Sequence, residues 1–471
     1  MIVRSTWPLP PSVSLSTPAP PPPPRARAPR AFTHPRSRYH SQDRNETLFH
    51  RVLIDNIREL APIVYTPTVG LACQQFGTSF RRPRGMYFNA YDAGDMGAMV
   101  YNWSQEDVHV IVVTDGGRIL GLGDLGVNGM GIPIGKLNLY CAAGGIAPHR
   151  VMPVMIDAGT NNKELLADPF YLGSKHTRID DEEYYELLDE FMFAIFQRFP
   201  NAFLQFEDFG SDHAMTVLER YKNRFCCFND DIQGTGAVAV AGVLSALNAI
   251  GEDASTALKK KRIMIAGAGS AGIGVATALA SAMAQQGIPL EEARKMFYVC
   301  DVDGVLSAER MSELTPEQQA FARDDDAAGL TLQECIDSVK PNILLGLTAC
   351  PGLFTEEVIT AMADNNERPI IFPLSNPTSK CEASAEQVYR WTEGRAIFAS
   401  GSPFDPVELN GKTYTPSQCN NMFIFPGLSL SFLPTPNQHT RCCHLSHPLC
   451  VSPCLCRSWP WRNAMQAEID Y

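Results

Sequence analysis

The sequence lacks an excess of positive charge. It has 39 Lys and Arg residues against 51 Asp and Glu residues, a formal net charge of −12 over 471 residues. Nucleic-acid-binding proteins neutralise phosphates with clustered Lys and Arg, so this balance argues against such a partner. The sequence also lacks the run of about 18 apolar, uncharged residues that a transmembrane helix needs. We therefore expect neither a nucleic-acid partner nor a membrane span.

Paired CxxC motifs are also lacking, although the chain contains 14 cysteines. Without such pairs the common structural zinc patterns are excluded, and we expect most cysteines to be reduced thiols in the core. Hydrophobic residues make up 45% of the chain and charged residues 19%, a balance typical of globular proteins. At about 150 residues per domain, the length predicts two or three domains.

The two ends differ in composition from the middle. Residues 1–40 contain arginines, serines and five consecutive prolines but no acidic residue. This composition is typical of an organelle transit peptide, while the prolines favour a disordered extension instead. We expect a mitochondrial protein, with the cytoplasm and the plastid as alternatives. Residues 431–471 form a Cys- and Pro-rich segment without helical or strand periodicity, which predicts an atypical tail.

The middle of the chain alternates between short apolar runs and helical segments. Two of the helical segments span 180–199 and 271–286. The apolar runs lie at 108–116, 151–159, 203–208, 224–230, 262–269, 296–301, 342–348, 369–377 and 396–403. Runs without polar alternation are typical of strands buried on both faces of a parallel sheet. The order predicts an α/β fold with two parallel-sheet domains, which meet near residue 232, and a short helical N-terminal region.

Acidic and amide residues follow several of these predicted strands. They are Asp115, Glu207, Asp208, Asn229, Asp230 and Asp231. In open α/β sheets, ligands bind at the carboxyl ends of the strands, where these residues lie. Asp and Asn also serve as helix N-caps, which would explain one or two of them. A cluster from three strands favours a bound cation, because crowded like charges repel one another.

The glycine pattern GxGxxG occurs twice, and only the second copy has the context of a dinucleotide site. Gly267, Gly269 and Gly272 follow a predicted strand and open a long apolar helix. Asp301 ends the next strand, where it can accept hydrogen bonds from an adenosine ribose. It lies 34 residues beyond Gly267, more than the usual ~20, because an extra helical segment intervenes. This arrangement predicts a Rossmann-type NAD-binding domain.

The first copy consists of Gly121, Gly123 and Gly126. Further glycines and Pro133 follow, which predicts that no regular helix starts there. A P-loop is excluded too, since Leu137 follows Lys136 where Ser or Thr would bind magnesium. We interpret this glycine-rich segment as a scaffold that presents Lys136 to a small-molecule cleft.

Several motifs together resemble those of malic enzymes. They are YTPTVGLACQQFG (65–77), RILGLGDLGVNGMGIPIGKL (118–137), QFEDFG (205–210), FNDDIQGT (228–235), LSNPT (374–378), FASGSPF (398–404) and NNMFIFPG (420–427). The resemblance covers roughly residues 41–430. It implies oxidative decarboxylation of L-malate to pyruvate and CO₂, with NAD or NADP and with Mg²⁺ or Mn²⁺. It also implies a substrate and metal domain over 41–232, an NAD-binding domain over 233–430 and a homo-oligomer.

The resemblance assigns roles to individual residues. Glu207, Asp208 and Asp231 match the metal ligands, and three carboxylates suit a hard divalent cation. Tyr65 matches the catalytic acid, Lys136 the general base, and Asp230 the residue that orients Lys136. The residues that match the substrate site are Arg118, Asn376 and Asn421. Those that match the cofactor site are Gly267, Gly269, Gly272, Asp301 and Asn376. A lysine acts as a base only if burial or nearby cations lower its pKa.

The cofactor and the overall activity are open at this point. Asp301 and Asp303 would repel the 2′-phosphate of NADP, and Gln318 stands where some family members have a lysine that marks NADP use; both favour NAD. Two alternatives to an NAD-dependent malic enzyme are a malolactic-type enzyme that releases lactate, and a non-catalytic product that only binds nucleotide. The family's helices beyond NNMFIFPG are replaced by the Cys-rich tail, which keeps the second alternative open.

Overall fold

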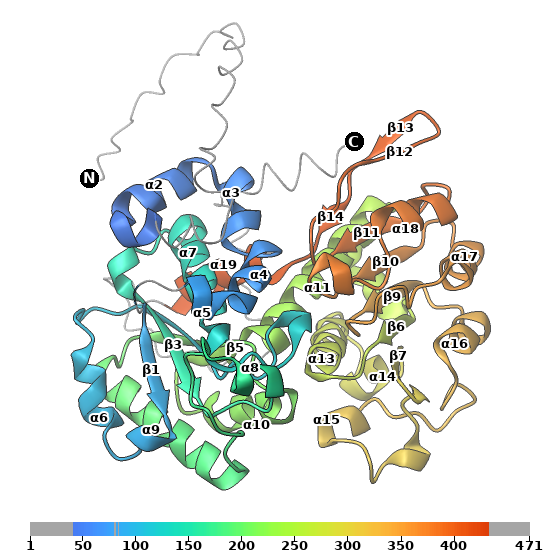
Figure 1. Cartoon of the computed structure of the whole chain (residues 1–471). Helices are drawn as coiled ribbons and strands as arrows, with labels where there is room; N and C mark the ends of the chain where they lie inside the picture. The colour runs from blue at the N-terminus through green and yellow to red at the C-terminus, as the bar shows by residue number, and fades with distance from the viewer. Residues whose placement is uncertain (1–40, 80–81, 83, 433–471) are drawn as a thin grey trace, which may run out of the picture.

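The computed structural model describes residues 41–79, 82 and 84–432. It contains two α/β units that lie side by side (Figure 1). The extension expected over residues 1–40, and the expected tail beyond Phe432, lie outside the described residues. Seven of the nine described cysteines are buried, which agrees with the expectation that most cysteines lie in the core.

The first unit is built on a five-stranded parallel sheet with the order β1-β3-β2-β4-β5. Its strands are β1 (Met86–Asn89), β2 (Val110–Thr114), β3 (Val151–Asp157), β4 (Phe203–Phe206) and β5 (Cys227–Asn229). Every residue of β2 and β4 is buried, since helices cover both faces of the sheet. The four strands β2 to β5 fall within the predicted runs, whereas β1 was not predicted.

Helices surround this sheet and give the unit its helical N-terminal region. They are α2 (Glu46–Asp55), α3 (Ile57–Val64), α4 (Thr68–Gln74), α5 (Phe76–Ser79), α6 (Met96–Met99), α7 (Gly131–Gly144), α8 (Lys163–Ala167), α9 (Asp181–Arg198) and α10 (Ser211–Tyr221). The predicted helix at 180–199 is α9, and the Asp180 side chain caps it by accepting the Glu183 N–H at 3.0 Å.

Helix α7 corrects one prediction. The glycines and Pro133 were expected to prevent a regular helix, yet α7 runs for 14 residues from Gly131. Pro133 lies in the first turn, where backbone N–H groups have no partner within the helix, so its missing N–H costs nothing there. Lys136 therefore projects from a rigid buried helix and not from a loop.

The second unit contains a seven-stranded sheet with the order β14-β11-β10-β9-β6-β7-β8. Its strands are β6 (Ile263–Ala266), β7 (Phe297–Asp301), β8 (Gly304–Val305), β9 (Ile343–Gly346), β10 (Ile370–Pro373), β11 (Ile397–Ser400) and β14 (Ser417–Gln418), and a separate hairpin joins β12 (Val407–Leu409) to β13 (Lys412–Tyr414). All neighbouring strands of the seven are parallel except β7 and β8. Strand order reverses at β6, which places a ligand crevice at its carboxyl end. The predicted fold class is confirmed.

The helices of the second unit are α11 (Thr235–Ala249), α12 (Ala254–Ala257), α13 (Ser270–Gln285), α14 (Leu290–Arg294), α15 (Pro316–Gln319), α16 (Leu332–Val339), α17 (Glu356–Asn365) and α18 (Ala385–Trp391); α19 (Phe425–Phe432) follows them in the chain. Within the described residues, one stretch, Asp230–Ala249, is long and apolar enough to cross a membrane by composition alone. In this fold 56% of its most apolar window is buried, as expected for a core helix, and α11 packs against α13.

The chain returns to the first unit after the second sheet. Helix α19 packs on α7 of the first unit (Figure 1). The Phe425 and Tyr140 rings lie 4.9 Å apart, and both side chains are fully buried. The first unit is therefore completed by a segment from the end of the described chain.

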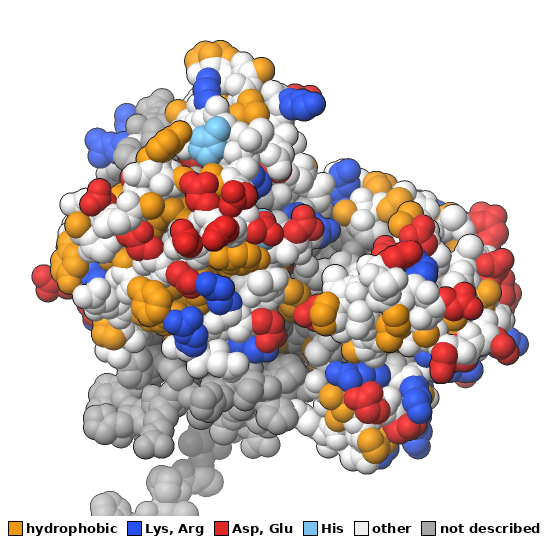
Figure 2. Space-filling view, turned by 90° about the horizontal axis from the view of Figure 1, so that it is seen from below, with side chains coloured by type: hydrophobic (Ala, Val, Ile, Leu, Met, Phe, Trp, Pro, Cys, Tyr) orange, Lys and Arg blue, Asp and Glu red, His pale blue; other side chains and the backbone are white. Residues whose placement is uncertain are grey.

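One face of the molecule carries charges of both signs (Figure 2). On the face seen in Figure 2, acidic and basic side chains of the described residues are interspersed, and no continuous basic area covers either unit.

Candidate active site

Three carboxylates converge at the carboxyl ends of β4 and β5. Glu207 and Asp208 directly follow β4, and Asp231 lies two residues after β5. One carboxylate oxygen from each lies within 4.8 Å of the other two. The Asp208 N–H also donates to Asp231 Oδ2 at 2.8 Å, which fixes the two side chains relative to one another. Neighbouring parallel strands end at the same edge, so the sequence order alone brings these groups together.

The electrostatics of this cluster fit a divalent cation. Burial raises the pKa of Glu207 and of Asp208 well above the ordinary carboxyl value, and it raises that of Asp231 as well. The mutual repulsion of the carboxylates raises these pKa values further. Asp208 Oδ2 is buried and has no hydrogen-bond donor. A hard cation with oxygen ligands would satisfy that atom and relieve the repulsion.

Lys136 lies against this cluster. Its side chain is 1% exposed, pairs with Glu207 Oε1 at 2.9 Å and donates to Asp230 Oδ2. Burial lowers the pKa of Lys136, but the carboxylates of Asp230 and Glu207 outweigh it and hold the pKa well above the usual lysine value. Without a cation to offset the charges of these acids, Lys136 therefore does not have the lowered pKa that a general base requires.

Tyr65 faces Lys136 from the end of α3. The tyrosine side chain is buried, and Lys136 Nζ lies 5.4 Å from its ring centroid. Burial raises the pKa of Tyr65 well above 10, and the Lys136 charge opposes this rise. The phenol is therefore a neutral proton donor at every physiological pH.

The predicted substrate residues border the same cluster. The Arg118 side chain is exposed and donates to Ser211, while its backbone N–H donates to Asp208 O at 3.1 Å. Asn421 donates to Asp230 Oδ2 at 3.1 Å and to Thr235 Oγ1 at 3.0 Å. The Asn421 side chain is thus held next to Asp230, whereas Arg118 contacts Asp208 through its backbone.

Asn376 belongs to the second unit, where it lies in the loop after β10. Its Oδ1 accepts a hydrogen bond from Ser402 at 2.7 Å, and its backbone oxygen accepts one from Gly121 N at 3.1 Å. The second unit therefore touches the first unit at this residue.

The second glycine motif forms the expected strand–loop–helix turn. Gly267 follows β6 with φ +112°, and a Cβ there would lie 2.5 Å from Leu347 O. A Cβ on Gly272 would lie 1.8 Å from Gly267 O, so only glycine lets α13 approach the loop. Gly269 immediately precedes α13, and the nearest atom to its Cβ position is Arg118 Nη1 at 3.8 Å. Asp301 ends β7, as predicted.

Two of the strand-end residues serve structure instead. Asp115 accepts the Tyr184 hydroxyl at 2.7 Å and lies 3.5 Å from Arg178. Asn229 accepts the Ile232 N–H at 3.1 Å, as an N-cap does. The cap interpretation therefore holds for Asn229, and the cation interpretation rests on the remaining acids.

Three residues that support the site were not predicted. Gln205 donates to Glu207 Oε2 at 2.8 Å, and Phe425 places its ring 4.5 Å from Lys136 Nζ. Fully buried Glu382 accepts from the N–H and the hydroxyl of Thr348, both at 2.8 Å, and from the Ser375 hydroxyl at 2.5 Å. A signal existed for Gln205, because residues i and i+2 of a strand share a face.

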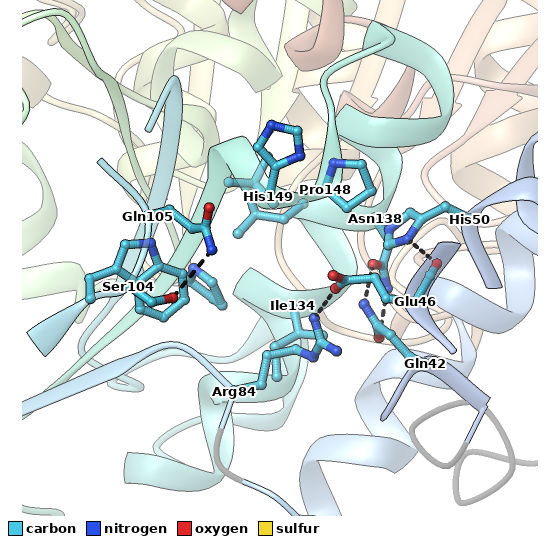
Figure 3. Close-up of a pocket in the computed structure, with 14 residues that line it drawn as sticks. Gln42, Glu46, His50, Arg84, Ser104, Gln105, Ile134, Asn138, Pro148 and His149 are labelled. Atoms are coloured by element: carbon cyan, nitrogen blue, oxygen red, sulfur yellow. Dashed lines mark hydrogen bonds and ion pairs between the residues drawn. The ribbon is translucent and has the colours of Figure 1, made fainter. Parts of the chain in front are cut away.

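A polar cavity of about 210 Å³ lies elsewhere, beside α2 and α7. In Figure 3, Arg84 pairs with Glu46, and Gln42 with Asn138, along one side of it. No predicted site residue lines this cavity.

Comparison with known proteins decides the family. Residues 42–222 match the family described as "Malic enzyme, N-terminal domain", and residues 232–441 match "Malic enzyme, NAD binding domain". The chain is 51% identical over 391 residues to the NADP-dependent malic enzyme of Dictyostelium discoideum, a match that covers 83% of this chain and 71% of that protein. This chain belongs to the malic enzyme family.

Other members extend the comparison. The NAD-dependent malic enzyme 2, mitochondrial, of Arabidopsis thaliana is 51% identical over 396 residues, which cover 83% of this chain and 65% of that protein. The solved malic enzyme of Pyrococcus horikoshii superposes with a TM-score of 0.50 at 25% identity and covers 80% of this chain and 72% of that one. The chain thus spans about two thirds of the length of the malic enzymes that it matches.

Proposed function

We propose that this malic enzyme family member oxidatively decarboxylates L-malate to pyruvate and CO₂, with NAD and a divalent cation, Mg²⁺ or Mn²⁺. The observation that carries the proposal is the convergence of Glu207, Asp208 and Asp231 beside Lys136. When bound, NAD accepts the hydride from C2 of malate, and the cation polarises the oxygen on C2. The chain's own residues supply the proton transfers and the positioning.

Lys136 is the proposed base for the malate hydroxyl. In the site without a cation it is held protonated by Asp230 and Glu207. Burial alone favours the neutral amine, so compensation of the carboxylate charges lowers the pKa of Lys136 toward the range that a base needs. Asp230 keeps the amine oriented and balances its charge while it carries the proton.

Tyr65 is the proposed acid that protonates the enol carbon after CO₂ leaves. Its buried neutral phenol faces Lys136, so the proton removed by one residue can be balanced by the proton given by the other. Arg118, whose backbone N–H contacts Asp208, and Asn421, whose side chain contacts Asp230, are proposed to hold the malate carboxylate and its hydroxyl.

The cofactor is proposed to be NAD. Asp301 and Asp303 would repel a 2′-phosphate, and the nearby Arg310 is already paired with Asp303 at 2.9 Å and Glu313 at 3.0 Å. Gln318 Nε2 donates to Ala268 O at 3.0 Å, so a neutral amide borders the glycine loop where a cation would serve NADP.

Location and assembly are proposals too. We propose a mitochondrial enzyme, as two similar malic enzymes carry "mitochondrial" in their names, and a homo-oligomer, either a dimer or a tetramer. We divide the chain into a substrate and metal domain over 41–232 and an NAD-binding domain over 233–430.

The test is malate-dependent reduction of NAD by the purified full chain with Mn²⁺, followed at 340 nm. We expect pyruvate to appear in step with NADH. Lys136→Ala should lower turnover by about 100-fold or more while NADH binding is kept. Lys163→Ala, which removes an exposed lysine of α8, should act as wild type.

Other outcomes favour the alternatives. Lactate without net NADH would identify a malolactic-type reaction. NADH binding without any turnover in the wild-type chain would identify a non-catalytic nucleotide-binding protein. Equal loss of binding and turnover in Lys136→Ala would point to a folding role for this residue.

A further inference from the structure

The first glycine motif lies between the acidic cluster and the second unit. Residues 118–123, here called the 118–123 loop, lead out of the segment after β2. The loop is closed on itself, because the Ile119 N–H donates to Gly123 O and the Leu122 N–H donates to Ile119 O, both at 2.9 Å. Ile119 is fully buried and anchors it.

One end of the loop holds Asp208. The Arg118 N–H donates to Asp208 O at 3.1 Å, and the Leu120 N–H donates to Asp208 Oδ1 at 3.2 Å. Leu120 and Asp208 both have a left-handed backbone, with φ of 49° and 53°. Such strain persists in non-glycine residues only where the surroundings fix it, and here each residue fixes the other.

A backbone hydrogen bond joins the middle of the loop to the second unit. The Gly121 N–H donates to Asn376 O at 3.1 Å. A Cβ on Gly121 would lie 2.7 Å from that oxygen and 3.0 Å from Lys380 Cγ. The contact therefore requires glycine, although Gly121 itself has no left-handed φ.

A continuous path of hydrogen bonds results. It runs from Asp231 to Asp208, through the 118–123 loop, to Asn376. We propose that this loop couples cation binding at the three carboxylates to dinucleotide binding beside Asn376, with Gly121 as the positioning residue. The inference rests on the cation and NAD sites of the proposed function.

Coupling of this kind is reciprocal: the cation tightens dinucleotide binding by the same factor by which the dinucleotide tightens cation binding. The experiment measures NADH affinity by fluorescence, with EDTA or with saturating Mn²⁺, and Mn²⁺ affinity by electron paramagnetic resonance. In the wild type we expect Mn²⁺ to tighten NADH binding at least about fivefold. In Gly121→Ala we expect the NADH affinities with and without Mn²⁺ to agree within about twofold. The Mn²⁺ affinity of this variant without NADH should stay within about twofold of the wild-type value.

Gly97→Ala is the matched control. It makes the same change in α6, where a Cβ would meet nothing within 4 Å, and it should keep the wild-type coupling. Wild-type coupling in Gly121→Ala, or no coupling in the wild type, would overturn the inference.

A second measurement applies if Gly121→Ala does not fold. Hydrogen exchange on the wild-type chain should show slower exchange over residues 118–123 with Mn²⁺ and NADH together than with either alone; unchanged exchange overturns the inference. Coupled binding without malate turnover would overturn the proposed function and leave this inference standing. Malate turnover without coupled binding would overturn this inference and leave the proposed function standing.

Discussion

Replacement of Asp208 by asparagine should stabilise the protein when divalent cations are removed. The asparagine side chain keeps the oxygen that accepts the Leu120 N–H, and its amide nitrogen takes the position of an oxygen that has no donor. The nearest carboxylate oxygens lie within 4.8 Å of one another, and at that limit two ionised carboxylates repel by about 3.5 kcal/mol at an effective dielectric constant of about 20. Burial keeps these carboxyl groups partly protonated, which reduces the repulsion. We therefore expect Asp208→Asn to raise the free energy of unfolding by about 1–3 kcal/mol.

The assay is thermal unfolding followed by circular dichroism, with EDTA and with Mn²⁺. In EDTA the Asp208→Asn midpoint should exceed the wild-type midpoint by a few degrees. With Mn²⁺ the order should reverse, because a ligand at 100 times its Kd stabilises the wild type by about 2.7 kcal/mol and the variant lacks one of the three proposed metal ligands.

Asp124→Asn provides the control with the opposite sign. Asp124 is paired with Arg178 at 3.0 Å, and although burial alone would raise its pKa, Arg178 outweighs burial and lowers it. Loss of this charge leaves Arg178 without that partner, so the midpoint should fall whether or not Mn²⁺ is present. A destabilised Asp208→Asn in EDTA would refute the reasoning, and so would equal stabilisation of wild type and variant by Mn²⁺.

Two further predictions follow from the same contacts. The raised pKa values of Glu207, Asp208 and Asp231 mean that the folded state holds protons more tightly than the unfolded state. The cation-free wild type should therefore lose stability as pH rises above about 4. The extra stability of Asp208→Asn over the wild type in EDTA should shrink to zero as pH falls toward about 4, and a stability difference that does not depend on pH would contradict this. Glu382→Ala strips Thr348 and Ser375 of their shared acceptor beside the nucleotide crevice, and NADH affinity in fluorescence titrations should fall about tenfold. Glu386→Ala, an exposed change in α18, should leave that affinity unchanged, and equal losses in both variants would contradict the assignment.

Much of the fold could be predicted because its strands are buried on both faces. Continuous apolar runs such as those of β2 and β6 need no tertiary information to be identified. Strand β1 lacks this signal, since only one of its four residues is buried. Helix α7 was missed for another reason: its glycines and Pro133 break isolated helices, and it is stabilised by burial against α2, α4 and α19 and against strands β2 and β3.

The acidic cluster was predictable from strand ends, but its surroundings were not. Asp115 and Asp208 follow strands in the same way, and only the partners Arg178 and Tyr184, which lie on later segments, separate a structural acid from a candidate ligand. Phe425 comes from still farther along the chain, so no local pattern relates it to Lys136. The raised pKa of Lys136 likewise depends on the balance of burial and charge in the folded site.

The return of α19 to the first unit bears on synthesis by the ribosome. Domains at the N-terminal side generally fold first as the chain emerges. Here Lys136 has no cover from Phe425 until that residue has left the exit tunnel, after the whole nucleotide-binding sheet. A fragment that ends at residue 232 would thus carry the acids and the lysine but leave them open to water. The covered site would form only after the fragment that contains Phe425 is added.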